Sequence, residues 1–67
     1  MSDIQKVVSE FNKIISRPDV DEDEKNIIKR YIKVCNEFIE KKRTATNEAI
    51  LSFKAVVKLY NPTAFSV

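Results

Sequence analysis

Apolar residues recur at steps of three and four along most of the chain, a spacing that places them on one side of an α-helix. In the first segment this apolar stripe consists of Ile4, Val7, Val8, Phe11, Ile14 and Ile15. Ser2 and Gln5 form a capping-box pattern at its start, and Pro18 disfavours the α conformation of Arg17. We therefore expect a first helix over residues 3–16.

The second segment opens with five acidic residues among the six from Asp19 to Glu24. Such a run favours a helix N-terminus, where the helix dipole and free N–H groups attract negative charge. Asp19 with Glu22 and Asp21 with Glu24 are two capping-box patterns, so the start is open by one turn. The apolar stripe that follows is wide: Ile27, Ile28, Tyr31, Ile32, Val34, Cys35, Phe38 and Ile39. We expect a second helix over residues 21–42.

The apolar pattern lapses over residues 40–48, where Thr44 or Thr46 can cap a new helix. Beyond the gap a third stripe follows: Ala49, Ile50, Phe53, Val56, Val57 and Tyr60. We expect a third helix over residues 46–60, ended by the sequence Asn61-Pro62. The alternative is one continuous helix over residues 21–60, about 60 Å long, most of which can pack only against a second molecule.

The length of 67 residues allows one domain with a marginal hydrophobic core. The chain has no glycine, on which tight phosphate-binding loops and many β-rich folds depend. We expect a small all-α three-helix bundle over residues 1–60, with a C-terminal tail over 61–67. In this bundle a helical hairpin is joined by a third helix, and the core is closed within one chain or completed by dimerisation.

The residue types argue against catalysis. There is no histidine, the most frequent general acid–base residue, and Cys35 lies on an apolar stripe where a small buried side chain is expected. One thiol without histidine cannot form a zinc site or an internal disulfide. We expect no enzyme activity, no metal and no cofactor. A single thiol suits a reducing compartment, and no apolar run is long enough for a membrane, so we expect a cytoplasmic protein without membrane contact.

A second apolar surface on the third helix points to binding of another protein. Leu51, Ala55 and Leu59 lie on the side opposite the main stripe, where a three-helix monomer exposes them to solvent. Phe65 in the tail is a further candidate for the same contact. We expect a protein–protein interaction module, such as an adaptor, a small chaperone or an inhibitor, that self-associates as a homodimer. The lysine-, isoleucine- and asparagine-rich composition is typical of A/T-rich genomes, including those of phages and other mobile elements.

The alternative is a small DNA- or RNA-binding regulator. Residues 19–24 carry a net charge of −5, whereas residues 25–67 carry +6. The candidate contacts to phosphates are Lys29, Arg30, Lys33, Lys41, Lys42 and Arg43. Such binding weakens steeply with salt. The helix spacing fits no helix-turn-helix motif, because the second helix is too long and no short turn leads into a recognition helix.

Overall fold

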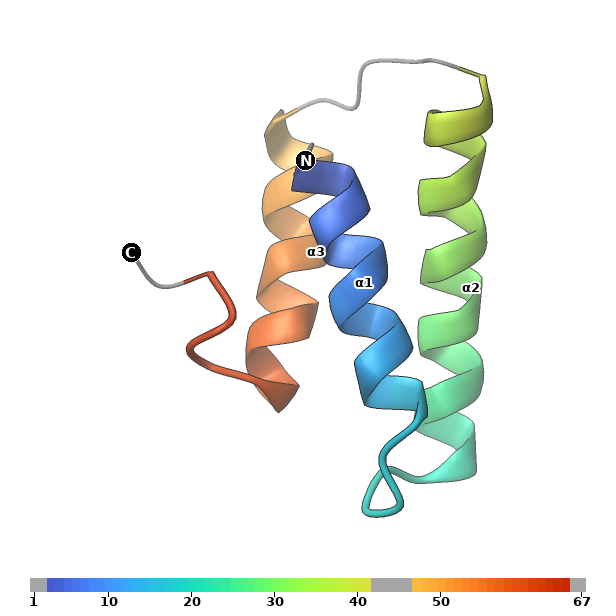
Figure 1. Ribbon diagram of the computed structural model, residues 1–67, viewed down its shortest axis with the longest axis vertical. Helices are drawn as coiled ribbons and strands as arrows, with labels where there is room; N and C mark the ends of the chain where they lie inside the picture. The colour runs from blue at the N-terminus through green and yellow to red at the C-terminus, as the bar shows by residue number, and fades with distance from the viewer. Residues whose placement is uncertain (1–2, 42–46, 66–67) are drawn as a thin grey trace.

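The computed structural model describes residues 3–41 and 47–65, which form three helices (Figure 1). These are α1 (Asp3–Ile15), α2 (Glu22–Glu40) and α3 (Asn47–Tyr60). Successive helices run in opposite directions, so that α1 and α3 point the same way and α2 runs against both, with α1 in the middle. No residue of the described ranges lies in a strand. The fold is a small all-α three-helix bundle, as the sequence predicts, and it measures 33 × 26 × 19 Å.

Helix α1 ends one residue before the predicted limit. At its C-terminus the Arg17 N–H donates to the Ile14 carbonyl at 3.0 Å, and the Ser16 N–H donates to the Lys13 carbonyl at 3.3 Å. These bonds span three residues instead of four, so they tighten the last turn before Pro18. The proline therefore ends the helix where the sequence indicates.

Helix α2 begins at the later of the two predicted starts. Asp21 is the N-cap in an extended conformation, and its carbonyl accepts the Lys25 N–H at 2.9 Å. Its side chain makes no capping hydrogen bond, so the capping box predicted for Asp21 and Glu24 is wrong. The earlier start does not occur because the carboxylate of Asp19 is bound by Arg17 in the loop.

The second and third apolar stripes belong to two separate helices that run in opposite directions. Helix α2 ends at Glu40, two residues before the predicted limit, and Lys41 is its C-cap, whose N–H donates to the Glu37 carbonyl at 3.0 Å. Because α2 and α3 run in opposite directions, the alternative of one continuous helix is wrong. The predicted caps Ser2, Thr44 and Thr46 lie outside the described residues.

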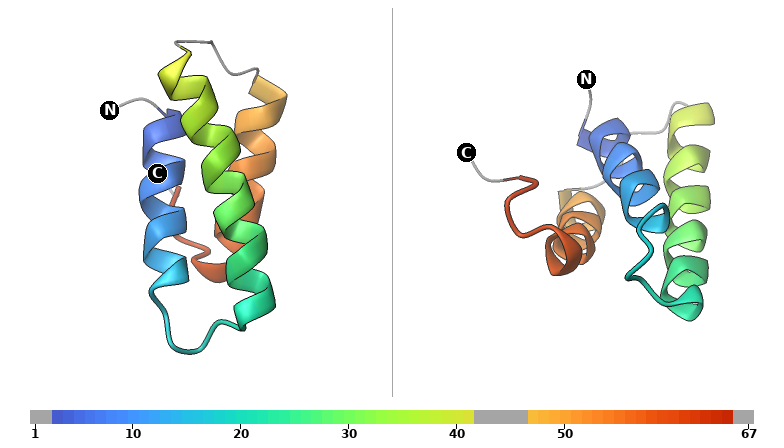
Figure 2. Two further views of the ribbon diagram at one scale, coloured as in Figure 1. Left: turned by 90° about the vertical axis from the view of Figure 1, so that its right-hand side faces the viewer. Right: turned by 60° about the horizontal axis from the view of Figure 1, so that its bottom comes forward.

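The core lies between the three helices, and α1 is the helix that packs against both others (Figure 2). Its buried apolar members come from each predicted stripe and from the first loop: Val7, Phe11, Ile14, Val20, Ile28, Cys35, Phe53 and Val57. One aromatic ring from each helix meets at the centre. Phe11 stacks on Tyr31 with ring centroids 5.9 Å apart, and Phe53 packs edge-on against both rings at 6.4 and 6.1 Å. Offset and edge-on arrangements of this kind are favourable for aromatic pairs.

Candidate functional site

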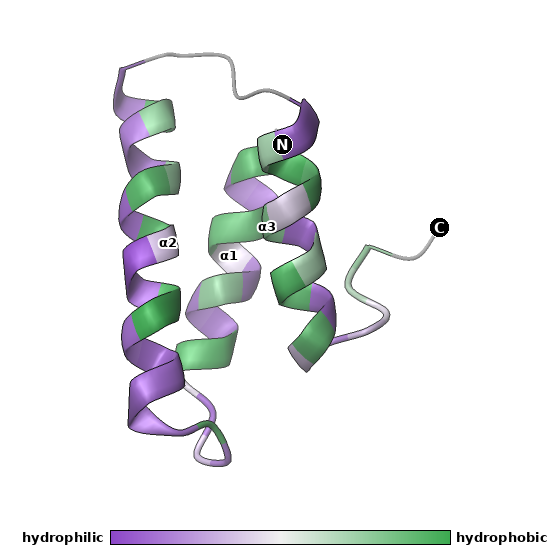
Figure 3. Cartoon of the chain, turned by 180° about the vertical axis from the view of Figure 1, so that it is seen from behind, coloured by the Kyte–Doolittle hydropathy of each residue, from purple (hydrophilic) through white to green (hydrophobic). Residues whose placement is uncertain are grey.

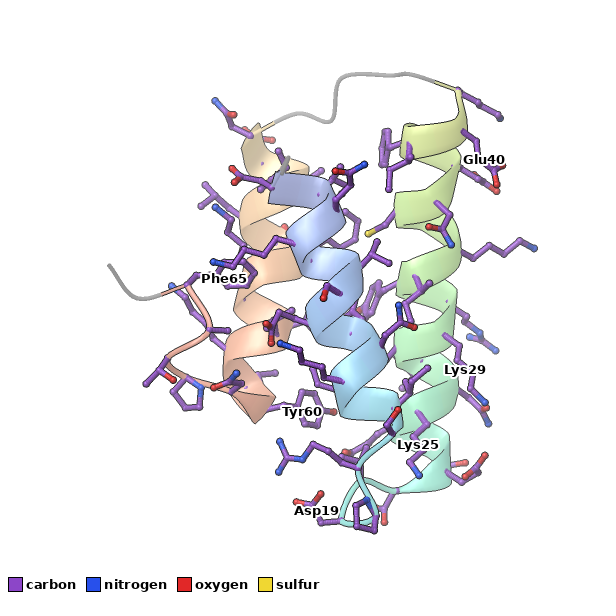
Figure 4. The ribbon with its side chains drawn as sticks, viewed as in Figure 1. Asp19, Lys25, Lys29, Glu40, Tyr60 and Phe65 are labelled. Atoms are coloured by element: carbon purple, nitrogen blue, oxygen red, sulfur yellow. The ribbon has the colours of Figure 1, made fainter. Side chains whose placement is uncertain are left out.

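Polar contacts fix the C-terminal end of α3 against the rest of the bundle. The Arg17 guanidinium donates to the Tyr60 carbonyl at 2.9 Å and to both carboxylate oxygens of Asp19, at 3.0 and 2.7 Å. The Tyr60 hydroxyl donates to Glu24 at 3.1 Å, so this end of α3 is bonded to the loop and to α2 (Figure 4). The Asn61 amide donates to the buried carboxylate of Glu10 on α1 at 3.4 Å. These contacts fix how α3 is rotated about its axis.

With this rotation, Leu51, Ala55 and Leu59 form a row along the outside of α3, which we call the α3 outer face. The Leu51 residue is 63% exposed and the Leu59 residue 80% exposed, and Ala55 between them is exposed as well. Phe53 and Val57, on the opposite side of the same helix, are buried in the core. Residues four apart on a helix lie one above the other, so the three side chains form a continuous apolar row. Seen from behind, hydrophobic positions recur along α3, whereas the outer edge of α2 is hydrophilic (Figure 3).

The α3 outer face carries opposite charges at its two ends. Glu48 stands in the first turn of α3 and Lys58 in the last turn, and both are exposed. Among the described residues, no ion pair involves either of them. Both charges therefore remain available to a partner that covers the apolar row.

Phe65 lies apart from the α3 outer face. The ammonium groups of Lys6 and Lys54 lie over its ring, at 5.2 and 5.3 Å from the centroid. Figure 4 shows Phe65 beside α1 and α3. Lys54 also pairs with Asp3 of α1 at 3.5 Å. Attraction of cations to the ring face stabilises such contacts. Phe65 is half-buried against the core, so of the four residues predicted to bind a partner it is the one already engaged within the chain.

Helix α2 exposes two apolar residues that the sequence pattern places on its inner stripe. The Ile27 residue is 49% exposed and the Val34 residue 42% exposed. The apolar stripe of α2 is wider than the part of it that α1 and α3 cover. Ile27 and Val34 lie along the uncovered edge of this stripe. The width of the stripe in the sequence is the feature that indicates this exposed edge.

The basic residues Lys29, Arg30 and Lys33 of α2 lie between acidic ones in the sequence. Lys29, Arg30, Lys33 and Lys41 are exposed, whereas Lys42 and Arg43 lie outside the described residues. The acidic side chains before and after the basic cluster are also exposed: Glu22, Asp23, Glu24, Glu37 and Glu40. Lys29 and Glu40 both project from the outer side of α2 (Figure 4). The positive segment along the described part of this helix is therefore short.

The one thiol of the chain is in the core. Cys35 is fully buried, and burial raises the pKa of its thiol to about 11. A thiol of this pKa is almost entirely protonated at neutral pH and is a poor nucleophile. A hollow of about 60 Å³ lined by Val34, Glu37, Phe38 and Lys41 is far smaller than an ordinary ligand pocket. Larger hollows of about 680 Å³ over α1 and about 380 Å³ over α2 are shallow and open to solvent, whereas ligand pockets enclose most of the ligand surface.

Over residues 3–41 and 47–65 there is no group of three acidic, cysteine or histidine side chains placed to hold a metal ion. Within the same ranges no helix combines the length and the apolar character needed to cross a membrane. Comparisons of the chain with protein-family models, with curated proteins and with solved structures give no match. A function can therefore be proposed only from the chemistry of the chain's own surface.

Proposed function

We propose that this chain is a non-enzymatic protein–protein interaction module, acting as an adaptor, a small chaperone or an inhibitor, and that it binds through the α3 outer face. The observation that carries the proposal is the exposure of Leu51 and Leu59 on α3. The opposite side of this helix is buried, and hydrogen bonds from Arg17 and to Glu10 hold its C-terminal end. A continuous exposed apolar row bordered by polar residues fits a protein-binding site. Glu48 and Lys58 supply the polar border.

The size of this face limits the affinity it provides. Complete burial of an exposed leucine contributes about 1.5–3 kcal/mol, whereas a micromolar complex needs about 8 kcal/mol. Leu51 and Leu59 therefore account for part of the binding free energy, and contacts from the flanking residues must supply the rest. Association also costs translational and rotational entropy. We expect reversible binding in the micromolar range.

Leu51→Asp and Leu59→Asp test the proposal. Both side chains point to solvent, so each variant is expected to keep the helix content of the wild-type chain in far-UV circular dichroism. Each places a charge in the apolar row, where it is costly to bury unpaired. We expect sedimentation velocity to show no self-association of either variant, and affinity capture with either variant to recover none of the proteins bound by the wild-type chain.

Ile27→Asp is the matched control, because it makes the same chemical change at an exposed apolar residue of a different helix. This variant is expected to bind as the wild-type chain does. The proposal is wrong if Leu51→Asp and Leu59→Asp change neither self-association nor the set of captured proteins.

A further inference from the structure

We infer that the partner of the α3 outer face is a second copy of this chain, and that the two α3 helices pair antiparallel across a two-fold axis at Ala55. This inference rests on the proposed function, since it names the occupant of the same surface. A two-fold contact is isologous, so that one patch must be complementary to itself. Three features of α3 provide this complementarity.

The first feature is the order of charges along the helix. Glu48 in the first turn and Lys58 in the last turn leave the face acidic at one end and basic at the other. In a parallel pair each of these residues would approach its own copy and repel it. In an antiparallel pair Glu48 approaches Lys58 of the second copy, and the helix dipoles are also oppositely aligned. By symmetry the attractive contact is made twice.

The second feature is the position of the smallest side chain. Ala55 lies midway between Leu51 and Leu59, four residues from each. With Ala55 on the two-fold axis, Leu51 of one copy packs against Leu59 of the other. A methyl side chain at the crossing point lets the helix axes approach to about 8 Å, the lower end of the usual range.

The third feature is the distance between the charged residues. Each residue of a helix advances about 1.5 Å, so Glu48 lies about 10 Å from the axis and Lys58 about 4.5 Å from it. In the antiparallel pair Glu48 and Lys58 of opposite copies are then about 6 Å apart along the helices. The long lysine side chain spans this distance, so the register set by the apolar row also allows the charged contact.

Cysteine cross-linking tests the direction and the register. Cys35 is fully buried, so an introduced surface thiol is the one available for oxidation. We expect Ala55→Cys to form a disulfide-linked dimer under mild oxidation. Leu51→Cys and Leu59→Cys should each fail to link to its own copy, because each lies about 6 Å from the axis and its copies about 12 Å apart. A mixture of these two variants should link to each other.

Lys33→Cys is the control for random collision, since it is exposed on α2 away from the α3 outer face. It should not cross-link under the same conditions. Linking of Leu51→Cys to its own copy would indicate a parallel pair and would overturn the inference, as would equal linking of Ala55→Cys and Lys33→Cys.

Charge reversal tests the pairing of Glu48 with Lys58. We expect Glu48→Lys alone and Lys58→Glu alone each to raise the dimer dissociation constant about five- to tenfold, because each brings like charges together twice. The double variant should return it to within about twofold of the wild-type value. Lys33→Glu is the control and should leave the dissociation constant unchanged.

The two proposals fail in different ways. If the chain is monomeric at high concentration, but Leu51→Asp and Leu59→Asp abolish the capture of another protein, the partner is not a second copy. The inference is then wrong while the proposed function stands. If these two variants affect no interaction of any kind, both proposals are wrong.

Discussion

At the scale of single residues, Arg17 joins the loop between α1 and α2 to the end of α3. Its guanidinium binds the Asp19 carboxylate in the loop and the carbonyl of Tyr60 at the end of α3. A cation is favourable at a helix C-terminus, where carbonyl groups lack helical partners. Hydrogen bonding to Arg17 holds the pKa of Asp19 below its ordinary value of 3.8. This one side chain therefore links the stability of the bundle to pH.

We expect Arg17→Met to lower the melting temperature at pH 7 by a few degrees. Because Asp19 has a lower pKa in the folded chain than in the unfolded chain, its stabilising contribution is complete above the ordinary value and is lost as the pH falls through the folded pKa. The difference in melting temperature between Arg17→Met and the wild-type chain should therefore be largest at neutral pH and become smaller below about pH 4. Thermal melts between pH 2.5 and 7 measure it.

Lys33→Met is the control, since it removes an exposed basic side chain on α2. Its melting temperature should follow that of the wild-type chain at every pH. If the difference in melting temperature between Arg17→Met and the wild-type chain grows as the pH falls, the pH dependence does not come from Asp19.

At the scale of the helices, the central aromatic cluster is the contact that all three share. Phe11 of α1 is fully buried and touches both Tyr31 of α2 and Phe53 of α3. No other pairing of rings connects α1 to both neighbours within the described residues. The relative placement of the helices therefore depends strongly on this one ring.

We expect Phe11→Ala to destabilise the fold by about 3–5 kcal/mol, the usual cost of removing a buried phenylalanine ring. A domain of this size has a total stability near the lower end of about 5–15 kcal/mol, so the variant should be largely unfolded at 37 °C. Urea denaturation followed by circular dichroism measures the loss. Phe11→Leu should cost less, and Leu59→Ala, on the exposed side of α3, should change the stability by no more than about 0.5 kcal/mol.

The positions of the helices follow from the sequence because each has one continuous apolar stripe. The α3 outer face was predictable for the same reason, since Leu51, Ala55 and Leu59 oppose the stripe that becomes the core. The start of α2 was open, because the choice depends on the bonding of Asp19 to Arg17, which periodicity does not reveal.

Other features depend on tertiary packing. Ile27 and Val34 belong to an apolar stripe in the sequence, but how much of that stripe is covered depends on the separation and angle of the neighbouring helices. Phe65 is held by lysines 59 and 11 positions earlier in the chain, Lys6 and Lys54, and no local pattern connects these residues. Local patterns therefore predict elements and faces, whereas contacts between distant segments need the structure.

At the scale of the whole molecule, one copy already has a complete core. Residues from α1, α2 and α3 enclose the aromatic cluster, and the polar contacts of Arg17, Tyr60 and Asn61 close one end of the bundle. The α3 outer face adds nothing to this core. A dimer formed through it should therefore dissociate into folded single chains.

This separation of folding from association predicts how stability depends on concentration. Because a second copy binds the folded chain and not the unfolded one, the melting temperature of the wild-type chain should rise with protein concentration. A concentration one hundred times the dissociation constant contributes about 2.7 kcal/mol, which raises the melting temperature by roughly 10–20 °C in a domain of this size. The melting temperature of Leu59→Asp should be the same at every protein concentration. On dilution, the wild-type melting temperature should fall to a comparable, concentration-independent value. The helix content of the wild-type chain should stay constant over the same dilution. Loss of helix content as the wild-type dimer dissociates would show instead that the two copies share one core.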